Sequence, residues 1–114
     1  MPKVSVRITW PEGIHLPDNA QALVTVEDVT AVDAPSVLVG ETVLEDLDPS
    51  RPMLAEVEVG EVDAGSDLVV RVHVADRSRT DRQVEVGDLV TTESYPVLTR
   101  GHGDSVVVRP RQIG

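Results

Sequence analysis

The sequence contains no cysteine and no phenylalanine, and Trp10 and Tyr95 are its only aromatic residues. Without thiols the chain forms no disulfide, no thiolate nucleophile, no Cys-ligated zinc site and no iron–sulfur cluster. Two aromatic rings cannot build the stacking platforms on which single-stranded nucleic acids bind. These shortages exclude several common kinds of catalytic and nucleic-acid-binding site.

Basic residues are also scarce, with 10 Lys and Arg against 20 Asp and Glu, for a formal net charge of −10. Such a field repels a phosphate backbone and an anionic membrane surface, so we expect neither as a partner. No run approaches the ~20 apolar residues of a membrane-spanning helix. The start, MPKVSVRITW, alternates apolar and polar residues and has no apolar signal core. We therefore expect a cytoplasmic protein, or an envelope lipoprotein if an N-terminal signal was removed.

Valine is abundant: it occurs 23 times, against 9 Leu and 3 Ile. Valine favours strands because its branched side chain packs well on a pleated surface. Apolar residues recur at every second position, while no stretch keeps a helical period. This alternation predicts strands at 3–10, 21–29, 36–44, 53–60, 67–76, 83–94 and 105–110, with a bulge at Gly40.

The predicted fold is all-β: an antiparallel two-sheet β-sandwich of about seven strands, with a Greek-key or immunoglobulin-like architecture. One domain, residues 1–110, accounts for the strands, and residues 111–114 form a short polar tail. A parallel sheet would need crossover helices for which the chain has no room.

The stretch DVTAVDAP, residues 28–35, joins two of these strands. An acid–base pair of Asp28 and Asp33 would need a pocket and a basic or phenolic partner, and the neighbouring sequence offers none. Pro35 favours an extended residue before it, and aspartate side chains accept hydrogen bonds from nearby backbone N–H groups. We predict a structural turn at Asp28, Asp33 and Pro35.

Other candidate sites are weak. His15, His73 and His102 match no metal-binding spacing, although a zinc site assembled by folding stays an alternative. The acidic stretches 46–48 and 63–67 lack the ligand order of a calcium loop. The sequence has no nucleophile elbow and no phosphate-binding loop. We therefore predict no enzyme activity, no cofactor and no metal.

One basic cluster lies between acidic residues at positions 76–82. Local neutralisation is its simpler interpretation, and docking of an anion is the alternative. Tyr95 stands beside a predicted turn. The candidate interaction residues are Arg77, Arg79, Arg82 and Tyr95.

Three segments in order, IHLPDNAQALVTVEDV, DVTAVDAPSVLVGE and SYPVLTRG, resemble the YbaY/YscW family of small lipoproteins, which includes type III secretion lipoprotein chaperones (pilotins). The resemblance covers about residues 14–101. The matching positions are Asp28, Asp33, Ala34, Pro35, Tyr95, Pro96, Val97, Leu98 and Thr99. It implies a β-sandwich with a non-catalytic role and, for pilotins, help to an outer-membrane secretin. The sequence departs from the family in having no lipidated cysteine and in Ala31, where a basic residue is common.

Three functions follow as hypotheses. The first is a non-enzymatic protein-interaction or accessory module that binds an unknown protein partner by strand addition, with the runs 3–10 and 105–110 as candidate edges. The second is a small-ligand or metal-binding protein with acidic loops. The third is a subunit that self-associates through an exposed valine face at 36–44.

Overall fold

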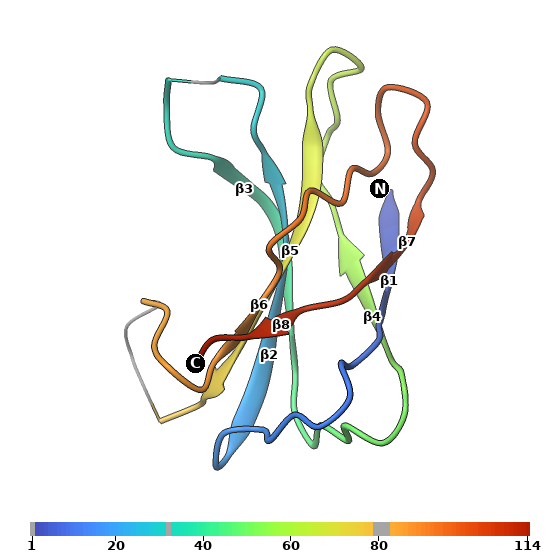
Figure 1. Cartoon of the computed structure of the whole chain (residues 1–114). Helices are drawn as coiled ribbons and strands as arrows, with labels where there is room; N and C mark the ends of the chain where they lie inside the picture. Colours follow the sequence, from blue (N-terminus) through green and yellow to red (C-terminus); the bar gives the residue numbers. More distant parts are fainter. Residues whose placement is uncertain (1, 32, 79–82) are drawn as a thin grey trace.

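The computed structural model of the chain describes residues 2–31, 33–78 and 83–114, which form two β-sheets packed face to face (Figure 1). The eight strands are β1 (Lys3–Ile8), β2 (Ala20–Asp28), β3 (Val37–Leu44), β4 (Met53–Glu58), β5 (Leu68–Asp76), β6 (Leu89–Val90), β7 (Ser105–Val108) and β8 (Arg111–Gln112). One sheet has the order β4-β1-β7, and the other has the order β3-β2-β5-β6-β8. The predicted all-β sandwich is confirmed. In the described part of the chain there is no helix of membrane-spanning length and hydrophobicity.

The core lies between the sheets and follows the alternation of the sequence. Val4, Val6 and Ile8 of β1 are fully buried, and the same parity is buried in the strands around it. The facing residues of the larger sheet are Ala22, Val24, Val26, Leu68, Val70, Val72, Val74 and Leu89. Burying one parity of each strand on a common core sets the register of the pairs, because a slip of one residue would turn every side chain to the wrong face.

The arrangement corrects three details of the sequence-based prediction. The run 3–10 contributes β1, which is the central strand of its sheet and therefore not a free edge, whereas β7 is an edge strand. Within the expected tail, residues 111 and 112 form β8, which pairs with β6. Finally, β1 and β7 pair in parallel. No crossover helix is needed for this pair, because the strands between them in sequence build the rest of the sandwich.

The two sheets approach each other closely where the edge strands β3 and β4 meet. The register of β3 on β2 shifts opposite Val26 and Glu27, which confirms the bulge predicted at Gly40. A Cβ atom at Gly40 would lie only 2.4 Å from the backbone oxygen of Glu58, at the end of β4. Beside it, the Gly60 N–H donates a hydrogen bond to the Val39 carbonyl at 3.4 Å. The absence of a side chain at Gly40 thus allows this side of the sandwich to close.

Candidate functional site

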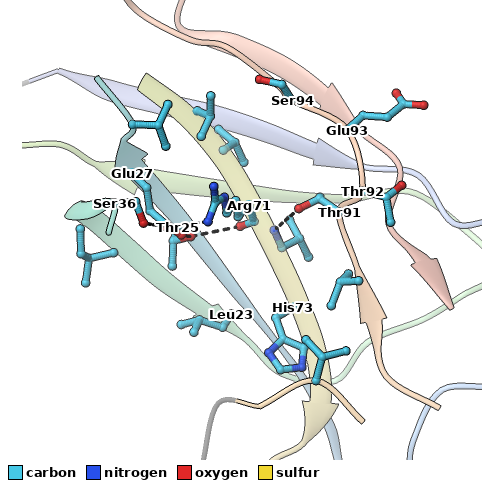
Figure 2. A pocket seen from close by; sticks show the side chains of 17 residues that line it. Leu23, Thr25, Glu27, Ser36, Arg71, His73, Thr91, Thr92, Glu93 and Ser94 are labelled. Carbon is cyan, nitrogen blue, oxygen red and sulfur yellow. Dashed lines mark hydrogen bonds and ion pairs between the residues drawn. The ribbon is translucent and has the colours of Figure 1, made fainter. Parts of the chain in front are cut away.

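A groove of about 780 Å³ lies on the outer face of the five-stranded sheet (Figure 2). Its floor comes from neighbouring positions of the two central strands, Leu23, Thr25 and Glu27 of β2 and Arg71 and His73 of β5. Leu38 of β3 lines one side, and Val84 with residues 90–94 lines the other. Thr25 is only 6% exposed although it points away from the core. The centre of this face is therefore recessed, which is unusual for the solvent side of a sandwich.

Glu27 is the polar centre of the groove floor. Its Oε2 accepts a hydrogen bond from the Thr25 hydroxyl at 2.7 Å, and its Oε1 accepts one from the Ser36 hydroxyl. The Arg71 Nη1 donates to the same Oε1 at 3.3 Å, and the pair is also an ion pair. The Glu27 side chain is 16% exposed. A carboxylate this sheltered requires compensating donors, and Glu27 has three.

Arg71 is the exposed member of this network. Its side chain is 54% exposed, and Glu27 is its only side-chain partner among the described residues. The remaining guanidinium donors are thus available to a ligand lying in the groove. Glu27 in turn holds one side of the guanidinium, so the Arg71 head group is positioned rather than freely mobile.

A second polar pair closes one end of the groove. The His73 Nε2 lies 2.8 Å from the Asp88 Oδ2, and Asp88 is 2% exposed. The same carboxylate oxygen accepts a hydrogen bond from the Glu85 N–H at 3.0 Å, which holds the segment after Val84 in place. The nearby Thr91 hydroxyl accepts a hydrogen bond from the Val72 N–H. This contact fixes the position of the His73 ring at the end of the groove.

The predicted turn residues lie outside the groove floor, in the connection between the adjacent antiparallel strands β2 and β3. The Asp28 Oδ1 accepts hydrogen bonds from the hydroxyl and, at 2.9 Å, from the backbone N–H of Thr30. These two bonds, the hydroxyl one first, lower the pKa of Asp28 below its usual value. Asp33 and Pro35 are exposed in the same connection.

Of the candidate interaction residues, Arg77 and Tyr95 contact different parts of the fold. Arg77 follows β5, its backbone N–H donates to the Asn19 carbonyl at 3.1 Å, and it borders a separate hollow with Asp18 and Asp46. Arg79 and Arg82 fall outside the described residues.

Tyr95 has a role that its sequence position did not suggest. Its hydroxyl accepts a hydrogen bond from the Arg109 N–H at 3.1 Å and lies 3.4 Å from the Arg109 carbonyl. Arg109 stands between β7 and β8, where the chain passes from one sheet to the other. Tyr95 thereby ties the two sheets together at this crossing.

The three histidines lie in different parts of the fold. His15 is in the loop before β2, His73 borders the groove, and His102 follows the left-handed residues Arg100 and Gly101. The described ranges contain no group of three or more His, Asp or Glu side chains placed to hold a metal ion.

The groove residues were missed at the level of sequence. Thr25, Glu27 and Arg71 stand on the outward parity of their strands, which the alternation of apolar residues indicates, and no motif singled them out. One signal in the sequence could have indicated a sheltered outer face. Leu23 and Thr25 make the outward positions of β2 less polar than those of a fully solvated face.

Comparisons with known proteins give two matches of different kinds. Residues 1–109 match the sequence model of YscW, described as the type III secretion system lipoprotein chaperone. A solved structure, an alternative pilotin from the type II secretion system of Vibrio cholerae, superposes with a TM-score of 0.71 over 96% of both chains, at 18% sequence identity. At that identity the structural likeness concerns the fold alone. The curated proteins include no match.

Proposed function

Because the chain belongs to the YscW family of type III secretion system lipoprotein chaperones, we propose that it is a non-enzymatic accessory protein that binds a partner protein in the groove over β2 and β5. The family description names a chaperone, which is a protein-binding role. The partner that the resemblance implies is a secretin, and the location that it implies is the cell envelope rather than the cytoplasm.

The recessed face of the larger sheet carries this proposal. A solvated sandwich face normally leaves its outward side chains exposed, as the outer face of the β4-β1-β7 sheet does with Arg7, Leu54 and Val107. The groove instead combines a sheltered, hydrogen-bonded floor with exposed apolar sides at Leu38 and Val84. Protein-binding surfaces combine apolar contacts with a limited number of direct hydrogen bonds.

A matched pair of leucine variants tests the location of the surface. Leu38 lies on edge strand β3 beside the groove and is 50% exposed, and Leu54 lies on edge strand β4 of the opposite sheet and is 64% exposed. Each Leu→Asp change adds the same charge at an exposed strand position. We expect L38D to weaken capture of a secretin by this protein at least tenfold, because it places a carboxylate where the partner buries apolar surface.

The measurement is the dissociation constant between the purified protein and the secretin in detergent, with both variants checked for an unchanged far-UV spectrum. L54D serves as the control and should bind within twofold of the wild type. Equal binding by all three proteins would refute the groove as the docking surface.

Self-association is a second candidate, favoured by the apolar edge of β3. Val37, Leu38 and Val43 of this strand are each about half exposed or more, and the outer edge of β3 has no neighbouring strand in its sheet. A long apolar edge is a template for strand addition. Sedimentation equilibrium from 1 to about 100 μM decides between self-association and binding of a different protein. A dimer that L38D dissociates would support self-association.

A further inference from the structure

We infer that the groove selects a partner segment in which one Asp or Glu side chain lies between apolar side chains, and that Arg71 is the residue that recognises the carboxylate. This inference rests on the proposed function and specifies the chemistry of the partner. It follows from the state of the charged groups in the groove.

Among the described residues that line the groove, Arg71 is the cation with donors still available. Its Nη1 faces Glu27 at 3.3 Å, and its side chain remains 54% exposed above the floor. The Thr25 and Ser36 hydroxyls already hold the Glu27 carboxylate in place. Glu27 can therefore orient the guanidinium of Arg71 while other N–H donors of that guanidinium stay unused. A guanidinium held in this way presents a planar pair of N–H groups that matches a carboxylate.

The other charged groups along the groove are engaged elsewhere. His73 faces Asp88 at 2.8 Å. Glu93 is largely exposed, and its Oε1 lies 4.0 Å from the Arg111 Nη2 on β8. Neither group offers a second point that would attract an acidic side chain.

The charge of the whole protein sharpens the selectivity. A formal charge of −10 repels an acidic segment over most of the surface. Along the described lining of the groove, a carboxylate in the partner is therefore favoured next to Arg71 and disfavoured at other registers. An attractive contact combined with repulsion elsewhere fixes how a segment lies in a groove.

The position of Arg71 favours a side chain within the segment over a terminal carboxylate. The groove continues along β5 in both directions from Arg71, to Val69 on one side and His73 on the other. A segment whose carboxylate meets Arg71 therefore extends past it both ways. Apolar side chains on either side of the acid would contact Leu38 and Val84.

Selection from a random 12-residue peptide library tests this directly. Peptides are selected on the wild-type protein, and those whose binding L38D weakens and L54D does not are kept as groove binders. We expect these binders to share one acidic residue between apolar residues. One binder is then synthesised with its acid, with Gln in that place, and with an amidated C-terminus.

Fluorescence anisotropy of these peptides against protein variants isolates the contact. On the wild type, Glu→Gln in the peptide should weaken binding about tenfold, as expected for a charge-assisted hydrogen bond. On the Arg71→Gln protein, the same change in the peptide should weaken binding by less than twofold, because the guanidinium that pairs with the carboxylate is gone. Arg7→Gln is the matched control: Arg7 is an exposed arginine on the outer face of the other sheet, and its variant should keep the tenfold effect.

Each remaining outcome overturns the inference. Groove-binding peptides without an acidic residue would refute the inference. So would a Glu→Gln change in the peptide that weakens binding equally on the wild-type and the Arg71→Gln protein. Either result would leave the proposed function standing. A tenfold loss on C-terminal amidation with no effect of the internal acid would assign Arg71 to a terminal carboxylate instead. A library without groove-dependent binders would contradict the proposed function as well. If Arg71→Gln fails to fold, Arg71→Lys keeps the charge without the planar fork and should reduce the tenfold effect to about threefold.

Discussion

Replacing Gly40 by alanine tests how the sandwich closes. The new Cβ would lie 2.4 Å from the Glu58 backbone oxygen and 3.0 Å from the Val57 Cγ1. Real Cβ contacts essentially never fall below 3.0 Å, so the carbonyl must retreat by the difference, about 0.6 Å. A flexible side chain could turn away, but a backbone carbonyl at the end of β4 moves only if the two edge strands separate.

The magnitude follows from three contributions. Overpacking of a well-packed site costs about 1–3 kcal/mol. Separation of the strands also weakens the Gly60 N–H bond to the Val39 carbonyl, already 3.4 Å long, which contributes up to about 1 kcal/mol. Alanine also restricts the unfolded chain, which raises the free energy of unfolding by about 0.4–1 kcal/mol and offsets part of the loss. We expect the free energy of unfolding to fall by about 2 kcal/mol, with a drop in Tm of roughly 8 °C for a chain of this size.

Urea unfolding followed by circular dichroism measures this loss, with Gly103→Ala as the control. A Cβ at Gly103 meets no atom within 4 Å, and that glycine has no left-handed φ. The control should therefore stay within about 0.5 kcal/mol of the wild type or be slightly more stable. If Gly40→Ala were as stable as Gly103→Ala, the close approach of β3 and β4 would not limit the fold, and the reasoning would be wrong.

Two further predictions concern polar contacts between segments. Tyr95→Phe removes the acceptor of the Arg109 N–H and should lower the free energy of unfolding by about 1 kcal/mol. Urea unfolding should show this as a lower midpoint at an unchanged m-value. An unchanged midpoint would mean that water replaces the hydroxyl without loss of stability. Asp28 should titrate below the ordinary aspartate pKa in an NMR titration of its carboxyl carbon, and Thr30→Ala should raise that pKa because it removes the hydroxyl donor. Since the folded pKa is lowered, the stability from this carboxylate is present above the unfolded pKa and is lost as the pH falls through the folded pKa. The Thr30-dependent part of the stability should therefore shrink on acidification, and a pKa that Thr30→Ala leaves unchanged would contradict the assignment.

The specificity of the proposed groove would depend on a polar contact between two neighbouring strands. Glu27 and Arg71 lie on the adjacent strands β2 and β5 in a recessed face, where the Glu27 carboxylate is sheltered from water. Polar contacts in such a setting discriminate between partners more strongly than they add affinity. This fits an accessory protein that recognises one segment of a larger partner.

The local alternation of side chains was enough to predict most of the fold. Val4, Val6 and Ile8 are buried as their parity indicated, and so are the inward residues of β2, β4 and β5. The bulge at Gly40 was also predictable, since glycine in a strand marks irregular pairing. These features depend on the two-residue period of a strand, which any stretch of sequence displays by itself.

The candidate site depended on contacts between distant residues. Glu27 and Arg71 are 44 positions apart, and only the register of β2 on β5 brings the carboxylate to the guanidinium. The parallel pairing of β7 with β1 and the bond from Tyr95 to Arg109 likewise join segments that no local pattern connects. Strand periodicity predicts which side chains turn inward. The order of strands in each sheet decides which outward side chains become neighbours, and that order is set by the packing of the whole chain.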